Sequence, residues 1–277
     1  MPPLSSLIHA ATRHALATGA LRPIEADTEL LEDAGVRFIV RAVSSLARKH
    51  EAPRGPAPAD PLGDYEPDLF VRELGPSHSL LLNKFNLLPG HVLLVTRRFE
   101  RQERLLTVED FEVLAACLRG IDGLGFYNAG VEAGASQPRK HLQLVPLPLA
   151  PQSPDAVPME HVLGSGPRPP FGHAFAPVAP QASASDLHDL YRSLLDRVGI
   201  GAVAGAGGET HSAPYNLLVR RGWMLAVPRT RADCEAIPVN ALGFAGSLFV
   251  RSRADLERVR AVGPMAVLQA VARAPQP

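Results

Sequence analysis

The sequence has little lysine and no surplus of either charge. Among its 277 residues, 28 lysines and arginines balance 28 aspartates and glutamates, and only Lys49, Lys84 and Lys140 are lysines. Proteins that bind nucleic acids or anionic membranes through a broad surface carry an excess of positive charge, because that charge releases counterions from the polyanion. The balance therefore argues against a nucleic-acid or membrane partner. It predicts that a bound nucleotide would meet a few locally placed groups.

Cysteine and long apolar runs are also scarce. Cys117 and Cys234 lie far apart and form no Cys-x-x-Cys motif, which excludes a disulfide framework and a ready zinc site. No apolar stretch reaches the roughly 18 residues that a membrane span requires. His9, Arg13 and His14 interrupt the N-terminal apolar stretch, where a signal peptide would have an uncharged core. We expect a soluble cytoplasmic protein.

Proline marks two irregular segments in a composition that is otherwise typical of a folded protein, with 46% hydrophobic residues. The 27 prolines concentrate between positions 49 and 67 and between 146 and 180. Because proline lacks a backbone donor and favours extended conformations, the first segment is predicted to be a loop or tether. The second predicts a boundary between two halves, residues 1–165 and 166–277.

The pattern of apolar residues predicts clusters of strands and helices. Alternating or β-branched residues predict strands at 36–43, 68–74, 78–85, 91–97, 125–128, 140–147, 214–221 and 223–228, and one at 239–252 broken by Gly243 and Gly246. Helical spacing predicts helices at 4–16, 107–118, 183–198, 254–262 and 265–273. Residues 26–35 are predicted to be a turn or short helix, 199–208 to be too rich in glycine for regular structure, and Gly207–Ser212 to be a surface loop. Because strands and helices are segregated rather than alternating, an α+β fold is predicted.

One window, Tyr127 to Pro148, carries the most chemical information. In a strand, His141 and Gln143 share one face while Leu142 and Leu144 occupy the other, which can enter the core. The preceding loop supplies Gly134, Ala135, Ser136 and Gln137, small or polar residues whose backbone N–H groups can approach an anion closely. A histidine taken alone would be interpreted as structural, but here donors and a candidate nucleophile converge on a phosphate-sized target.

This window resembles a known family. The pattern YN-x-G-x-x-x-G-[SA]-S-Q-x-x-K-H-L-Q, here Tyr127 through Gln143, is similar to that of the diadenosine tetraphosphate phosphorylases, also called ATP adenylyltransferases, in the histidine triad superfamily. Similar stretches extend in matching order over nearly the whole chain, including LLLNKFNLLPGHVLLVTRRFERQ, YNLLVRRGWMLAVPR and NALGFAGSLFVR. The resemblance implies a histidine-triad-like α+β core with a mainly antiparallel sheet and flanking helices, in which two halves form one cleft.

The resemblance also implies roles for particular residues. His141 would be the nucleophile that forms a covalent adenylyl-histidine, and Gln143 would contact phosphate oxygens. Further positions match substrate-binding residues of the family: Lys49, Asn83, Lys84, Asn128, Gly134, Ala135, Ser136, Gln137, Asn240, Ala241, Leu242, Ser247 and Arg251. Arg251 stands where family members have lysine, so a cation is retained with a different shape.

The implied reaction is the reversible phosphorolysis of diadenosine tetraphosphate to ATP and ADP. A neutral imidazole suits it, because the ordinary histidine pKa of about 6.5 leaves a free nitrogen near neutral pH. A divalent cation, magnesium, is expected to accompany the polyphosphate, with no tightly bound organic cofactor and no metal ligands in the protein. Partners would be small nucleotides and phosphate. Two alternatives remain: a phosphorylase or hydrolase for another nucleotide such as adenylyl sulfate, and a non-catalytic dinucleotide sensor.

Other polar residues receive structural interpretations. Arg139 would share the face of His141 if the strand extends that far, and would be solvated if Pro138 ends it. Lys140 points to the opposite face and is left out of the catalytic set. His91 is predicted to pack beside a turn, and Trp223 and Met224 to lie in the core. Four further histidines are predicted to lie in loops: His78, His161, His173 and His211.

Overall fold

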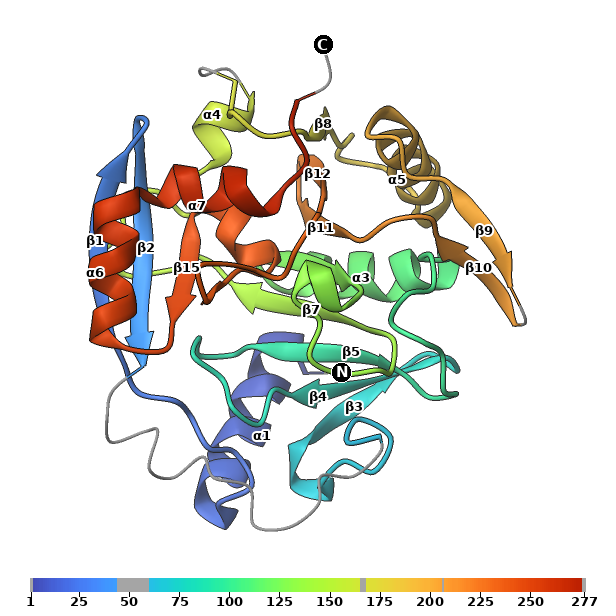
Figure 1. Cartoon of the computed structure of the whole chain (residues 1–277). Coiled ribbons are helices and arrows are strands. Elements are labelled where there is room, and N and C mark those ends of the chain that lie inside the picture. The colour runs from blue at the N-terminus through green and yellow to red at the C-terminus, as the bar shows by residue number, and fades with distance from the viewer. Residues whose placement is uncertain (1, 44–59, 165–167, 206, 276–277) are drawn as a thin grey trace.

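The computed structural model describes residues 2–43, 60–164, 168–205 and 207–275 (Figure 1). Its centre is an eight-stranded sheet in the order β3-β4-β5-β7-β6-β11-β12-β8, and every neighbouring pair is antiparallel. The strands are β3 (Phe70–Leu74), β4 (His78–Leu82), β5 (Val92–Thr96), β6 (Gly123–Ala129), β7 (His141–Pro146), β8 (Ala174–Pro177), β11 (Tyr215–Arg220) and β12 (Trp223–Pro228). The predicted α+β fold with a mainly antiparallel sheet is confirmed.

Helices cover one face of this sheet. They are α1 (Leu4–Thr18), α3 (Val108–Gly120) and α5 (Ala184–Arg197), which pack on apolar side chains of β4 to β7, β11 and β12. Thr107 and Asp110 form a capping box at the start of α3, and Ser183 and Asp186 do so at α5, so both predicted helix starts are confirmed. A hydrophobic core fills the space between these helices and the sheet. It contains Leu142 and Leu144, which therefore lie on the helix side.

A three-stranded sheet, β1 (Ala26–Asp33), β2 (Val36–Val43) and β15 (Ser247–Val250), lies with α6 (Arg253–Val262) and α7 (Pro264–Val271) on the opposite side of the molecule. β15 runs parallel to β2. Apolar residues of this layer pack on Phe126, Leu218 and Leu225 of the large sheet. His141, Gln143 and Asn128 lie on this face by strand alternation, because Leu142 and Tyr127 belong to the helix side.

The two halves of the sequence share both sheets. β8, β11 and β12 come after residue 166 and extend the sheet that begins with β3, while β15 pairs with β2. Small elements complete the fold: η1 (Pro67–Leu69), η2 (Val131–Ala133), α4 (Glu160–Gly164), η3 (Ala241–Ala245) and the pairs β9 (Ala202–Gly205) with β10 (Gly208–His211) and β13 (Asp233–Cys234) with β14 (Ile237–Pro238).

Three predicted segments were wrong. Residues 26–33 form strand β1 instead of a turn or helix, because all eight residues pair with β2. Residues 202–205 and 208–211 pair as β9 and β10, so the predictions of no regular structure at 199–208 and of a surface loop at Gly207–Ser212 were wrong. The segment predicted as a broken strand at 239–252 is the short helix η3 followed by β15. His78 and His211 also lie in strands, β4 and β10, and His161 lies in α4, rather than in loops.

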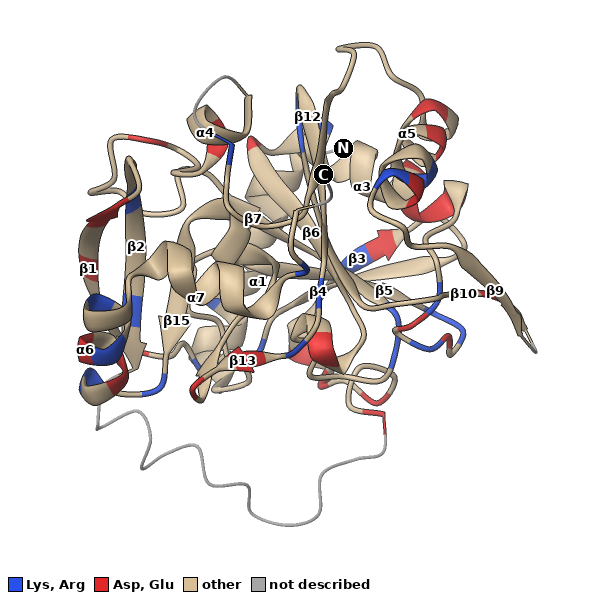
Figure 2. Ribbon diagram, turned by 45° about the horizontal axis from the view of Figure 1, so that its top comes forward, with Lys and Arg blue, Asp and Glu red and all other residues tan. Residues whose placement is uncertain are grey.

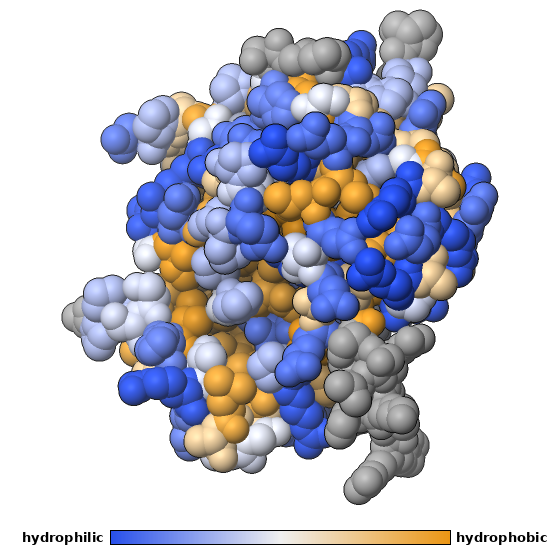
Figure 3. Space-filling model, turned by 90° about the vertical axis from the view of Figure 1, so that its left-hand side faces the viewer, coloured by the Kyte–Doolittle hydropathy of each residue, from blue (hydrophilic) through white to orange (hydrophobic). Residues whose placement is uncertain are grey.

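The surface carries charges of both signs and scattered apolar residues. Figure 2 shows basic and acidic residues side by side on β1 and α6, where Arg253 and Arg260 pair with Glu29. Figure 3 shows apolar side chains between polar ones on the side that carries these elements. No helix among the described residues has the length and apolarity needed to cross a membrane.

Candidate active site

His141 begins β7 and is 4% exposed. Its Nδ1 lies 2.8 Å from the carbonyl oxygen of Arg139, which can only accept, so Nδ1 carries the proton and Nε2 holds a lone pair. Burial lowers the pKa of His141, so the ring stays neutral near pH 7. Nε2 makes no hydrogen bond within the described residues and is not sealed from solvent. The side chain therefore has the protonation state of a nucleophile.

The carboxamide of Gln102 lies between β6 and β7 at the nucleophile. Its Oε1 accepts from the backbone N of His141 at 2.9 Å, and its Nε2 donates to the carbonyl oxygens of Asn128 at 2.9 Å and His141 at 3.3 Å. Gln102 is 1% exposed. The pairing of β6 with β7 stops at Phe126 and Gln143, and beyond it the Gln102 side chain bridges the two strands. The Gln102 carboxamide thus fixes the backbone of Asn128 relative to that of His141.

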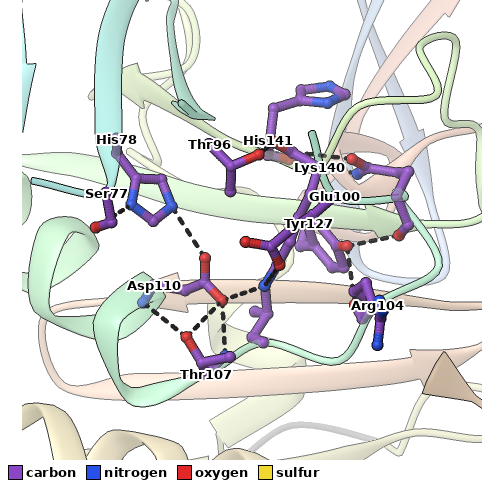
Figure 4. Close-up of polar contacts among 12 residues, drawn as sticks. Ser77, His78, Thr96, Glu100, Arg104, Thr107, Asp110, Tyr127, Lys140 and His141 are labelled. Atoms are coloured by element: carbon purple, nitrogen blue, oxygen red, sulfur yellow. Dashed lines mark hydrogen bonds and ion pairs between the residues drawn. The ribbon is translucent and has the colours of Figure 1, made fainter. Parts of the chain in front are cut away.

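Lys140 is anchored on the other side of the sheet. Figure 4 shows its side chain and that of His141 pointing in opposite directions. Lys140 Nζ lies 2.5 Å from a carboxylate oxygen of Asp110, whose other oxygen accepts from Nε2 of His78 at 3.0 Å. All three side chains are buried. The exclusion of Lys140 from the catalytic set agrees with this geometry, since the ion pair serves to hold the residue before the nucleophile.

Gln143 is held by a chain of side chains. Its Oε1 accepts from Nε2 of His91 at 2.9 Å, and Nδ1 of His91 accepts from the Asn83 amide at 3.1 Å. Burial lowers the pKa of His91 to about 4, which keeps its ring neutral, and the ring also packs on Phe126. Both hydrogens of the Gln143 amide stay without a partner in the described part of the chain. Gln143 therefore presents a donor.

A pocket of about 330 Å³ lies between the loop at 131–136 and the C-terminal part of the chain. Gly134, Ala135, Ser136, Asn240, Ser247 and Arg251 are among its lining residues, so both halves contribute. Gly134 has φ of +88°, and an added Cβ would lie 2.8 Å from the Val239 carbonyl oxygen. Only glycine permits this close approach. His141 and Gln143 do not line this pocket.

The remaining predicted residues occupy different surroundings. Asn128 is buried, and its Oδ1 accepts from the backbone N of Ala241 at 2.9 Å. The backbone N of Leu242 bonds to Oδ1 of Asn240, which caps η3. Lys84 pairs with Glu66 and lies over the Phe85 ring. Gln137 is half-buried, and Lys49 lies outside the described residues.

Arg139 does not offer its charge to the face of His141. Its guanidinium bonds to both carboxylate oxygens of Asp60 and to the carbonyl of Thr96, while its own carbonyl holds His141. Because β7 begins at His141, the alternation that would have brought the two side chains to one face does not reach Arg139. Arg251 is exposed and makes no ion pair within the described residues.

Several residues around the site were missed or misinterpreted from sequence. His91, predicted to be a packing residue, bonds to two predicted site residues, Asn83 and Gln143. Gln102 received no role. Arg41 donates to Oγ of Ser247 at 2.8 Å, which leaves the hydroxyl hydrogen for another acceptor. A signal was available for the amides: the chain has only five asparagines, and three of them, at 83, 128 and 240, are predicted site residues.

Within the described residues there is no group of three or more histidine, cysteine, aspartate or glutamate side chains that could hold a metal ion. The polar side chains nearest His141 are instead the amides of Gln102, Asn128 and Gln143, and the separate pocket adds the Ser136 hydroxyl; such groups suit phosphate oxygens. An α+β fold that presents a neutral histidine beside such donors is the arrangement of a nucleotidyltransferase.

Comparison with known proteins agrees with this class. Residues 2–165 match the Ap4A phosphorylase N-terminal domain, where Ap4A is diadenosine tetraphosphate, and residues 167–274 match the ATP adenylyltransferase C-terminal domain. The chain belongs to the Ap4A phosphorylase family, whose members are ATP adenylyltransferases.

Two relatives come from Saccharomyces cerevisiae. Protein APA1 is 28% identical over 90% of this chain and 87% of its own length. Diadenosine 5',5'''-P1,P4-tetraphosphate phosphorylase 2 is 28% identical over 92% of this chain and 90% of its own length. The crystal structure of yeast Ap4A phosphorylase Apa2 matches with a TM-score of 0.83 and 25% identity, covering 99% of this chain and 98% of that one. Apa2 has also been crystallised with AMP and with Ap4A.

Proposed function

We propose that this chain cleaves Ap4A by phosphorolysis to ATP and ADP through a covalent adenylyl group on His141. The observation that carries the proposal is the state of this histidine: buried, neutral, protonated at Nδ1 and unbonded at Nε2 within the described residues. Membership of the Ap4A phosphorylase family supplies the substrate class.

The first step is a displacement at phosphorus. Nε2 of His141 forms a bond to the α-phosphorus of one adenosine, and the bond from that phosphorus to the bridging oxygen breaks, so that ATP leaves. The Arg139 carbonyl accepts from Nδ1–H and stabilises the positive charge that the ring gains. In the second step an oxygen of inorganic phosphate attacks the same phosphorus, the N–P bond breaks, and ADP is released with the neutral imidazole restored.

Gln143 favours transfer over acid-assisted departure. A carboxamide donates hydrogen bonds but cannot give up a proton near pH 7. The leaving group in this reaction is a polyphosphate anion that needs no proton, so an amide held by His91 with its hydrogens outward is sufficient. We assign Gln143 and Asn128 to the oxygens of the α-phosphate, where charge develops in the transition state.

The other predicted residues would hold the rest of the nucleotide. Ser136 offers its backbone N–H and its hydroxyl at the pocket, which Asn240, Ser247 and Arg251 also line, whereas the Ala135 N–H donates to the Gly130 carbonyl at 3.1 Å. Gln137 would add an amide, and Lys84 and Lys49 would place ammonium groups along the polyphosphate. The donor set lacks carboxylates, so we propose that magnesium arrives bound to the polyphosphate as part of the substrate.

Product analysis tests the reaction. We expect ADP and ATP from Ap4A only when phosphate is present, and a phosphate-independent rate of cleavage would contradict phosphorolysis. Trapping tests the intermediate: Ap4A labelled at the α-phosphate should leave acid-labile label on the wild-type chain and none on His141→Ala. His161→Ala is the matched control, because His161 is exposed and bonds only to the Gly35 carbonyl. If the wild-type protein binds Ap4A but acquires no label, the chain would be a non-catalytic sensor.

A further inference from the structure

Two polar residues behind Asn128, Asn216 and Arg229, have no role in the reaction as described. Asn216 is 0% exposed and Arg229 is 1% exposed. Both come from the C-terminal half, on β11 and directly after β12, whereas Asn128 lies on β6. Asn216 pairs with Asn128 in the β6–β11 register, so the two side chains share one face of the sheet.

The hydrogen bonds around these residues permit one orientation of each amide. Arg229 Nη1 donates to Oδ1 of Asn216 at 2.5 Å, and because a guanidinium only donates, this bond identifies the Asn216 oxygen. The Asn216 amide then donates to Oδ1 of Asn128 at 2.9 Å and to the Ala133 carbonyl at 2.8 Å. Asn128 Oδ1 also accepts from the backbone N of Ala241. The Asn128 amide nitrogen must therefore face away from Asn216.

That nitrogen is free to donate. Nδ2 of Asn128 makes no hydrogen bond within the described part of the chain and is not a buried unpartnered atom. If the carboxamide were turned over, its NH₂ would face two donors and its oxygen would repel an anion. The relay thus decides whether Asn128 attracts or repels phosphate.

Burying the charged guanidinium of Arg229 costs more free energy than is needed to orient an amide, which points to a function beyond folding. Burial lowers its pKa to about 10, and it stays charged at neutral pH. It forms no ion pair with a carboxylate of the described residues and bonds instead to the carbonyls of Val271 and Arg231, with its guanidinium over the Phe244 ring. A buried cation without a counterion is costly in an empty protein but favourable when an anion binds nearby.

We propose that Arg229 and Asn216 are positioning residues that hold the Asn128 amide as a donor toward the nucleotide phosphate. The inference rests on the proposed function, since Asn128 is placed at the α-phosphate there. It also explains how the C-terminal half takes part in chemistry at a histidine of the N-terminal half. Four bonds among the described residues join the halves here: Asn216 donates to Asn128 and to the Ala133 carbonyl, Arg229 donates to the same carbonyl, and the Ala241 N–H donates to Asn128.

The test uses Asn216→Asp. The new carboxylate keeps the bond from Arg229 but repels the Asn128 oxygen, so the Asn128 carboxamide turns and presents its oxygen to phosphate. We expect kcat/KM for Ap4A to fall about 100-fold, the usual effect of losing one preorganised donor. Gln181→Glu makes the same amide-to-acid change at an exposed position and should leave the rate unchanged.

A double-mutant cycle separates positioning from a general structural effect. In an Asn128→Ala background, Asn216→Asp should lower kcat/KM less than about 3-fold further, because the group through which it acts is gone. An equal loss in both backgrounds would overturn the relay.

Side-chain amide NMR supplies a readout that needs no variant and no turnover. Selective ¹⁵N labelling of the five asparagines should show slow exchange for the buried and bonded NH₂ groups of Asn216 and Asn86, and a rapidly exchanging Asn128 group that shifts when AMP is added. A protected Asn128 amide that ignores AMP would contradict the relay even if Asn216→Asp does not fold. Wild-type protein that binds AMP with this shift but does not cleave Ap4A would overturn the proposed reaction alone.

Discussion

Acidification should destabilise the protein through His91. Burial holds the pKa of His91 at about 4, whereas the unfolded chain titrates near the ordinary value of 6.5. Between pH 6.5 and about 4, His91 is protonated in the unfolded state but not in the folded state. The free energy of unfolding therefore falls as the pH drops through this range. Above 6.5 both states are neutral and the contribution is constant.

The magnitude follows from the width of the window. A difference of about 2.5 pKa units at about 1.4 kcal/mol per unit gives about 3 kcal/mol lost on going from pH 7.5 to pH 4. Because His91 is half-buried as a whole residue, we take this as the upper figure. The loss is a large share of the roughly 5–15 kcal/mol by which domains are stable. Protonation would also turn Nδ1 into a donor facing the Asn83 amide.

Urea unfolding across this range measures the effect. His91→Gln keeps an amide able to donate to Gln143 and removes the titrating group. We expect the pH-dependent loss of stability to be smaller in this variant than in the wild type by about 3 kcal/mol at most. His161→Gln, at an exposed histidine, should retain the wild-type slope. Parallel curves for the wild type and His91→Gln would refute the argument, because they would mean that His91 titrates alike in both states.

Three further predictions concern the nucleophile and its surroundings. Gln102→Leu leaves the buried His141 N–H and Asn128 carbonyl without partners. At about 1–3 kcal/mol for each group, we expect the free energy of unfolding in urea to fall by about 2–6 kcal/mol. A fall of less than about 1 kcal/mol would contradict the bridging role. Because burial lowers the pKa of His141, kcat/KM should stay level from pH 8 to 6.5 and fall only below that, as the ring becomes protonated; a fall that begins above pH 7 would be inconsistent with it. Lys84→Arg should reduce turnover on Ap4A more than it reduces the melting temperature, and an unchanged rate would remove Lys84 from the polyphosphate site.

Much of the fold could be predicted because its signals are local. The alternation in the segment from His141 to Pro146 places histidine and glutamine on one face and leucines on the other, and the packing of the leucines confirms it. Thr107 and Asp110 indicate the start of α3 for a similarly local reason. The tested predictions that failed concern segments whose secondary structure depends on pairing with another strand. Residues 26–33 carry no strong strand pattern, yet a turn at Ala34 and Gly35, both with positive φ, folds them onto β2.

The sequence by itself therefore determined the family, the elements with strong periodicity, and the face that His141 and Gln143 share. It did so because side-chain alternation and motif order are properties of the chain alone. Only the tertiary structure decided which atoms of the site are donors. His91, Gln102, Asn216 and Arg229 act through hydrogen bonds to residues distant in sequence, and the direction of an amide depends on which partner meets it after folding.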